Sequence, residues 1–167
     1  MEFASCELMR NQSLPASVAS EKGRTWRAYA VGLSAGAGAI HWIVAQEHFA
    51  HWWGYGSFFL VAGATQVAYA VLLALKEPSR RWLVAGLIGN GLIVVVYLIT
   101  RTVGIPFVGP SAGEIEPVGR ADVISKATEL ALMACLVLML RARGAAPSEH
   151  ASPSLRESTR SRTNKDE

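Results

Sequence analysis

Charged side chains are scarce in this sequence: Asp, Glu, Lys and Arg together make up 17% of its 167 residues. A soluble domain with a solvated surface carries about 25% of such residues. Apolar residues make up 51% of the chain, and the mean hydropathy is positive. This composition excludes an ordinary soluble domain and predicts an integral membrane protein.

Cysteine is nearly absent as well. Cys6 lies in a polar N-terminal segment and Cys135 in the last apolar run, so the two are expected far apart and a disulfide is not expected. The first 25 residues contain no continuous apolar core and no small-residue cleavage site, so a signal peptide is not expected there. We expect this segment to be retained as a polar tail.

The net charge of +3 does not indicate a nucleic-acid partner. Lys and Arg concentrate in the tails and in one short connection, whereas a nucleic-acid-binding protein displays them on one face of its folded body. These charges are therefore interpreted as determinants of membrane topology.

Four long apolar runs dominate the chain and predict an all-α, four-helix transmembrane bundle, because about 20 helical residues cross a bilayer core of about 30 Å. The spans are expected at about residues 27–50, 57–75, 82–101 and 121–140, within a domain of residues 26–143. A polar tail, residues 1–25, precedes the domain, and a disordered tail, residues 144–167, follows it.

A long loop between the third and fourth runs, residues 102–120, contains three prolines and four glycines. This composition predicts an ordered series of tight turns. The sequence thus predicts a large Pro/Gly loop that covers one end of the bundle.

Lys and Arg are placed asymmetrically around the spans. They occur before the first run, between the second and third and after the fourth, but are rare in the other two connections. The positive-inside rule then predicts a multi-pass protein of the cell membrane with both termini in the cytoplasm. The Pro/Gly loop and the connection between the first two spans are expected on the extracytoplasmic side.

Small residues repeat at four-residue spacing in the first apolar run, where Gly32 precedes Gly36 and Ser34 precedes Gly38. Such spacing favours close approach of another transmembrane helix. We therefore expect this half of the helix to pack closely.

Polar residues recur at two depths in the predicted bundle. From the rise of 1.5 Å per residue, His41, Gln66 and Glu129 are expected in one layer roughly 12 to 14 Å below the outer end. A second layer nearer that end is expected to contain Glu47, His48, His51, Tyr97, Arg101, Asp122 and Lys126, with Glu114 and Glu116 on the loop above.

Helical periodicity places these residues on shared faces. At 100° per residue, His41 and His48 lie within about 20° of each other, and Glu47 and His51 flank them. On the fourth helix, Asp122, Lys126 and Glu129 share a narrow face. We expect both faces to turn inward, toward each other and Arg101, because such groups need partners inside a membrane.

Imidazole and carboxylate groups that converge from two helices are suitable ligands for a transition metal such as zinc, iron, manganese or copper. The pattern matches no established metal motif, and bis-histidine haem ligation is disfavoured because these histidines lie on one helix or its outer end. The candidate metal ligands are His41, His48, His51 and Glu129, with Glu47 as an alternative.

Two other interpretations of these residues remain open. A ligand site or proton relay would use His41, Glu47, Arg101, Asp122, Lys126 and Glu129. In a purely structural interpretation, Glu129 pairs with Lys126 or His41, and Asp122 pairs with Arg101. Gln66 and Asn90 are expected to form hydrogen bonds between helices.

Two segments resemble parts of small bacterial four-helix membrane proteins. They are Glu47-His-Phe-x-x-Trp-Trp-x-x-Gly-x-Phe-Phe59 and Thr100-Arg-Thr-x-Gly-x-Pro-x-x-Gly-Pro-x-Ala-Gly-x-x-Glu-x-Val-Gly-x-x-Asp122. The resemblance covers roughly residues 27–140. It implies the membrane architecture and no activity, cofactor or functional residue.

The sequence therefore predicts a membrane protein with an outward-facing His/Glu site that binds a metal ion or a small polar ligand. The alternatives are a component of a proton-coupled transporter or channel, or a structural membrane subunit. An enzyme that uses the same residues as metal ligands or as acid and base is a third option and is less expected, because no nucleophile constellation is visible. The expected partners are the lipid bilayer and a second copy or other subunits of a membrane complex, with no nucleic acid.

Overall fold

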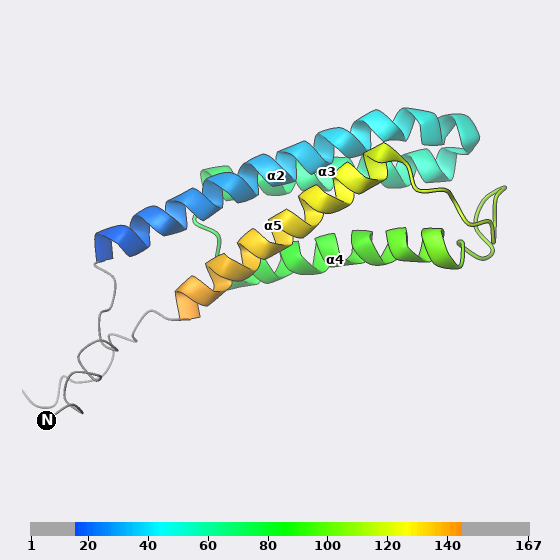
Figure 1. Ribbon diagram of the computed structural model, residues 1–167. Helices are drawn as coiled ribbons and strands as arrows, with labels where there is room; N and C mark the ends of the chain where they lie inside the picture. The colour runs from blue at the N-terminus through cyan, green and yellow to red at the C-terminus, as the bar shows by residue number, and fades with distance from the viewer. Residues whose placement is uncertain (1–15, 145–167) are drawn as a thin grey trace, which may run out of the picture.

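The computed structural model describes residues 16–144, and within this range it contains four α-helices (Figure 1). They are α2 (Ala16–His51), α3 (Trp53–Leu75), α4 (Arg80–Thr102) and α5 (Arg120–Gly144). Each helix is long and apolar enough to cross a membrane. The prediction of an all-α fold with four candidate spans is confirmed, and the fold is consistent with a multi-pass membrane protein.

Helix α2 begins at Ala16, about ten residues before the expected start near Trp26. The sequence contains no proline between Pro15 and Pro78, and Ala, Glu and Lys in the added segment favour helix. The predictions of a polar tail over residues 1–15, including Cys6, and of a disordered tail over 145–167 fall outside the described residues.

The bundle has two distinct ends. The end that carries the turn between α2 and α3 together with the loop of residues 103–119 is called the loop end. The opposite end, called the terminal end, carries the start of α2, the end of α5 and the connection between α3 and α4 (Figure 1). The first and last described residues therefore lie on the same side of the bundle.

Contacts between the helices are uneven. Helix α2 packs along α3 and α5, and α4 packs mainly on α5. In Figure 1, α5 crosses the bundle diagonally, from α2 at the loop end toward α4 at the terminal end. At the loop end, contacts between α4 and α5 are therefore made by long side chains, such as that of Arg101.

Close approach of α2 and α3 depends on small residues, as the sequence predicts for one of its two pairs. Ser34 Oγ donates a hydrogen bond of 2.7 Å to the Gln66 carbonyl, and a Cβ on Gly38 would lie 2.9 Å from the Gly63 oxygen. A Cβ on Gly32 or Gly36 would meet nothing within 4 Å. Gly32 and Gly36 therefore do not take part in this interface.

A single extended residue, Trp52, connects α2 with α3. The Trp52 ring lies over Gly54, the second residue of α3, where a Cβ would lie 2.0 Å from the ring and would force it to move. Trp52 and Tyr55 pack edge to face with ring centroids 5.0 Å apart. This aromatic turn forms one wall of the loop end.

The terminal half of the bundle has an apolar core. All four helices contribute to it, and its buried members are Ala30, Leu73, Leu83, Leu132, Cys135, Leu136 and Met139. Large apolar side chains elsewhere face outward, among them Val61, Ile88, Leu92 and Ile124, each more than half exposed. Such a surface matches a lipid environment, where apolar side chains need no cover.

Candidate functional site

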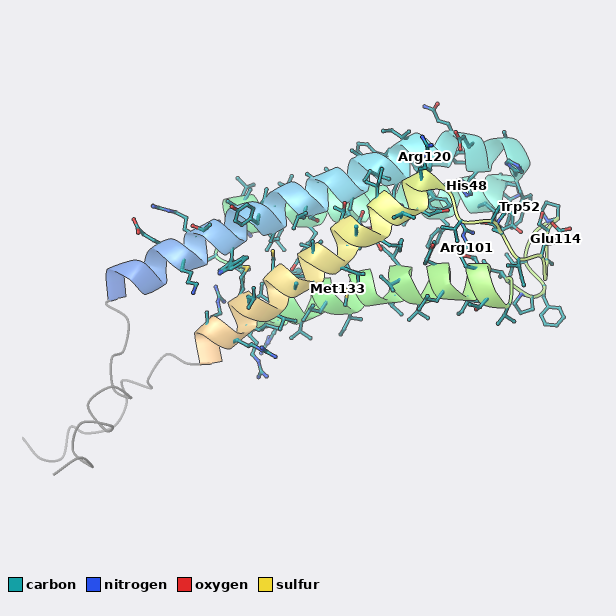
Figure 2. All side chains as sticks on the ribbon, viewed as in Figure 1. His48, Trp52, Arg101, Glu114, Arg120 and Met133 are labelled. Atoms are coloured by element: carbon teal, nitrogen blue, oxygen red, sulfur yellow. The ribbon has the colours of Figure 1, made fainter. Side chains whose placement is uncertain are left out.

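A cavity of about 210 Å³ lies in the loop half of the bundle, between the apolar core and the 103–119 loop. Side chains of all four helices and of the loop line it. Its apolar and aromatic walls include Val44, Trp52, Phe58, Phe59, Ile93 and Val96. Figure 2 shows His48, Trp52 and Arg101 near this end, with Glu114 on the loop beyond them.

A buried polar cluster lies at the inner end of the cavity. His41 Nε2 lies 3.0 Å from Glu129 Oε1, and both side chains are almost fully buried, at 2% and 0% exposure. Ser125 donates to the same carboxylate oxygen at 3.1 Å, and Lys126 donates to Oε2 at 2.5 Å. Three donors from two helices therefore share one carboxylate.

The contact with Glu129 selects one tautomer of a neutral His41 imidazole. An ionised Glu129 supplies only acceptor oxygens, so the ring nitrogen that faces it, Nε2, is the donor. Because the Lys126 ammonium already balances the charge of Glu129, a neutral imidazole leaves the cluster without net charge. In that tautomer Nδ1 is an acceptor, and it is buried with no hydrogen-bond partner.

A second polar cluster lies closer to the loop. Arg101 on α4 forms ion pairs with Glu116 on the loop and, at 2.8 Å, with Asp122 on α5. Asp122 also accepts a hydrogen bond of 2.8 Å from the Gly119 backbone N–H, which is consistent with a carboxylate at a helix start. Arg101 thereby joins α4, α5 and the loop.

Tyr97 links the two clusters. The Arg101 guanidinium lies 5.3 Å and the Lys126 ammonium 5.2 Å from the centroid of its ring. Both distances are within the range of cation–π attraction. The aromatic ring therefore helps to stabilise two cations that are removed from bulk water.

The loop is attached to the helices at further points. Tyr55 donates a hydrogen bond of 2.9 Å to the Val108 carbonyl, and the Glu116 N–H donates one of 3.2 Å to the Thr100 carbonyl. Gly104, Gly109 and Gly113 have positive φ, which an L side chain rarely adopts. The loop is thus attached to α3 and α4 and contains three glycines in a left-handed conformation.

A third polar group separates the cavity from the apolar core. Gln66 Nε2 on α3 donates to Asn90 Oδ1 on α4 at 3.3 Å, and Asn90 donates to the Gly86 carbonyl at 2.9 Å. The prediction that Gln66 and Asn90 bond between helices is confirmed. Gln66 shares a depth with His41 and Glu129 in the prediction, but its hydrogen bonds go to Asn90 and Ser34 instead.

The proposed metal ligands do not converge. The Nδ1 atoms of His48 and His51 bond to backbone carbonyls of their own helix, at 2.8 and 2.9 Å. Glu47 is exposed, because six residues of helix turn it about 120° away from His41. Within residues 16–144, no group of three or more His, Cys, Asp or Glu side chains could hold a metal ion.

Most of the expected ligand or relay residues do come together. His41, Lys126 and Glu129 form the inner cluster, and Arg101 and Asp122 form the outer one. Glu47 and His51 lie outside the cavity, whereas His48 lines it. The polar residues therefore form two clusters with specific hydrogen bonds. These include the pairs Glu129–Lys126, Glu129–His41 and Asp122–Arg101, which the structural interpretation also predicts.

Three participants had no role assigned from the sequence: Ser125, Tyr55 and Phe59. Ser125 stands one helical turn before Glu129, a spacing that could have indicated the contact. Phe59 packs on His48 with ring centroids 4.1 Å apart, and Tyr55 binds the loop. The aromatic contacts depend on the turn at Trp52, so the sequence pattern alone does not indicate them.

Comparison of the chain with protein-family models, curated proteins and solved structures finds no match. The function must therefore be argued from the chain itself. Chemically, the site offers a partly open, largely apolar space with aromatic walls and two internally paired polar clusters.

Proposed function

We propose that this protein is a membrane protein that binds a small neutral molecule in the cavity beneath the 103–119 loop. The observation that carries the proposal is the cavity itself, about 210 Å³ of space lined by side chains of all four helices. A cavity with apolar walls and a few polar groups is the usual form of a small-molecule site.

The charges at the cavity favour a neutral ligand. Arg101 is paired with two carboxylates and Lys126 with one, so neither cation that lines the cavity is available to an anion without breaking an ion pair. Breaking the Lys126–Glu129 pair to bind an ion would be especially costly, because the Glu129 side chain is fully buried. A neutral molecule needs only space and hydrogen bonds.

A metal ion is not favoured as the ligand. Both oxygens of Glu129 already accept bonds from His41, Ser125 and Lys126, and an ammonium group beside the carboxylate repels a cation. The remaining candidate histidines bond to backbone carbonyls. Metal binding would require rearrangement of the whole inner cluster.

Binding is favoured over passage across the membrane. Below the cavity lie the Gln66–Asn90 hydrogen bond and the apolar core of the terminal half. Transport would require this core to open. We further propose that the cavity faces the extracytoplasmic side, since Lys and Arg cluster at the terminal end.

The test is binding of phenol, a small neutral ring, to the purified protein in lipid nanodiscs. The cavity-filling variant is Val96→Trp, and the matched control is Val95→Trp, a neighbour that is 50% exposed on the outer surface. Phenol should bind wild type and Val95→Trp, at a level above uptake by empty nanodiscs, and should not bind folded Val96→Trp. Equal uptake by all three proteins would contradict the proposal.

A further inference from the structure

Two of the side chains that line the cavity each have a buried polar atom without a hydrogen-bond partner, and the two belong to different clusters. They are Nδ1 of His41 and Nε of Arg101, and both side chains line the cavity. Buried polar atoms in folded proteins are nearly always paired with protein, water or ligand. Each of these atoms therefore defines a position where a bound molecule is expected to place a polar group.

The two atoms require opposite hydrogen-bonding groups on the ligand. Arg101 Nε carries a hydrogen and can only donate, so it requires an acceptor on the ligand. His41 Nδ1 is an acceptor while Nε2 donates to Glu129, so it requires a hydroxyl or amine hydrogen. The ligand must present a donor at its inner end and an acceptor oxygen at its outer end.

The separation between these positions limits the size of the ligand. The spacing of the two clusters along α5 serves as a guide to this separation: Arg101 bonds to Asp122 and His41 to Glu129, and these two residues are seven positions apart, or roughly 10 Å along the helix. A benzene ring with para oxygens spans about 5.5 Å, and a hydrogen bond of about 2.8 Å at each end extends this to about 11 Å. One ring therefore matches the span.

Volume and surroundings agree with a single ring. A protein cavity of roughly 150 Å³ accepts benzene, so the 210 Å³ present here accommodates one ring with two short substituents. The aromatic side chains of Trp52, Tyr55 and Tyr97 line the same space. Rings of this kind pack favourably against another aromatic molecule.

We propose that the cavity binds a neutral para-substituted phenol, whose hydroxyl donates to His41 Nδ1 and whose opposite oxygen accepts from Arg101 Nε. This inference rests on the proposed function, because it specifies the ligand of the same cavity. Apolar side chains of α3 and α4, Phe58 and Val96, line the cavity where these helices make few contacts with each other. On this proposal a lipid-soluble phenol enters from the bilayer between these two helices.

The experiment compares three probes of nearly equal size on wild-type protein in nanodiscs. 4-Methoxyphenol carries both the hydroxyl and the acceptor oxygen, 4-methylphenol lacks the acceptor, and 4-methylanisole lacks the hydroxyl. Each hydrogen bond should strengthen binding by roughly three- to tenfold. We expect 4-methoxyphenol to have the lowest dissociation constant, after subtraction of uptake by empty nanodiscs.

Two variants assign the bonds to their residues. His41→Gln keeps an amide donor for Glu129 but removes Nδ1. In this variant 4-methoxyphenol should no longer bind more tightly than 4-methylanisole, but it should still bind more tightly than 4-methylphenol. Arg101→Lys keeps the charge for the carboxylates but removes Nε. In this variant 4-methoxyphenol should no longer bind more tightly than 4-methylphenol, but it should still bind more tightly than 4-methylanisole. His51→Gln changes an exposed histidine outside the cavity and should leave both ratios unchanged.

Each outcome has a definite meaning because every variant is judged by ratios between probes. Equal binding of all three probes to wild type overturns the ligand class, while the binding function stands if phenol binds. Preferences that persist in both variants also overturn it. Failure of phenol and of all three probes to bind overturns the proposed function as well. If His41→Gln does not fold, the Arg101→Lys ratio decides alone.

Discussion

His41 on α2 and Glu129 on α5 are 88 residues apart in the chain, yet their side chains meet at 3.0 Å in the buried interior. Lys126 approaches the other oxygen of the same carboxylate at 2.5 Å. The cluster joins α2 to α5. The charged groups of Lys126 and Glu129 are therefore already paired with each other in the absence of a ligand.

The first prediction concerns removal of the shared carboxylate. Glu129→Ala leaves the Lys126 ammonium buried without its partner, and His41 and Ser125 lose their acceptor. Breaking a buried ion pair on one side costs about 3 to 5 kcal/mol, so we expect a loss of that size in the free energy of unfolding. The measurement is unfolding by denaturant in detergent micelles.

A double variant separates charge from packing in this experiment. Lys126→Met combined with Glu129→Leu replaces both charges with apolar groups and should be less destabilising than Glu129→Ala alone. Glu47→Ala removes an exposed carboxylate from α2 and serves as the control. A Glu129→Ala protein as stable as the control would show that the cluster contributes nothing to folding.

The second prediction concerns attachment of the loop. Arg101→Ala removes both ion pairs that join α4 to Glu116 and Asp122. A hydrogen bond to a charged group contributes about 1.5 to 3 kcal/mol, so amide exchange at Glu116 should accelerate by at least roughly tenfold. The measurement is hydrogen exchange followed by mass spectrometry over residues 103–119.

Arg120→Ala is the matched control, because it removes the same charge from an exposed position at the start of α5. Exchange in the loop should remain at the wild-type rate in this variant. Equal protection of the loop in both variants would mean that its turns and the Tyr55 hydrogen bond to Val108 are sufficient to hold it.

The contacts that sequence reasoning predicts are those governed by helix geometry. The meeting of His41 with Glu129 follows from equal depth and helical phase, because a membrane interior compels polar side chains to find each other. The inclusion of Glu47 and His51 among the ligands is not supported, since the same phase turns them outward. Geometry of regular helices is thus the predictable part.

The loop contacts are beyond such reasoning for a physical reason. Glu116 reaches Arg101 only because the turns between them have particular dihedral angles, including a positive φ of 67° at Phe107. A non-glycine residue adopts this conformation uncommonly, so composition does not indicate where it occurs. The position of the cavity depends on these turns and on the single-residue connection at Trp52.

The third prediction tests the close contact between α2 and α3. A Cβ on Gly38 would lie 2.8 Å from Val67 Cγ2 and 2.9 Å from the Gly63 carbonyl oxygen, so Gly38→Ala forces the helices apart. Overpacking of this kind costs about 1 to 3 kcal/mol. The free energy of unfolding should fall by that amount, whereas Gly36→Ala, which would meet nothing within 4 Å, should not be destabilising.

The fourth prediction concerns the side of the membrane that the cavity faces. In a background of Cys6→Ser and Cys135→Ala, single cysteines are introduced as Ala112→Cys on the loop and as Ser79→Cys at the terminal end; both positions are exposed. Because Lys and Arg cluster at the terminal end, a membrane-impermeant maleimide added to intact cells should label Ala112→Cys.

Ser79→Cys should react only after the membrane is permeabilised. The reverse pattern would place the loop in the cytoplasm and would expose the cavity to cytoplasmic ligands. Labelling of both positions in intact cells would contradict a single orientation, because one span, α4, separates the loop from the connection before it and keeps the two on opposite sides when all chains insert alike. The labelling pattern therefore decides which compartment supplies a water-borne ligand to the loop end.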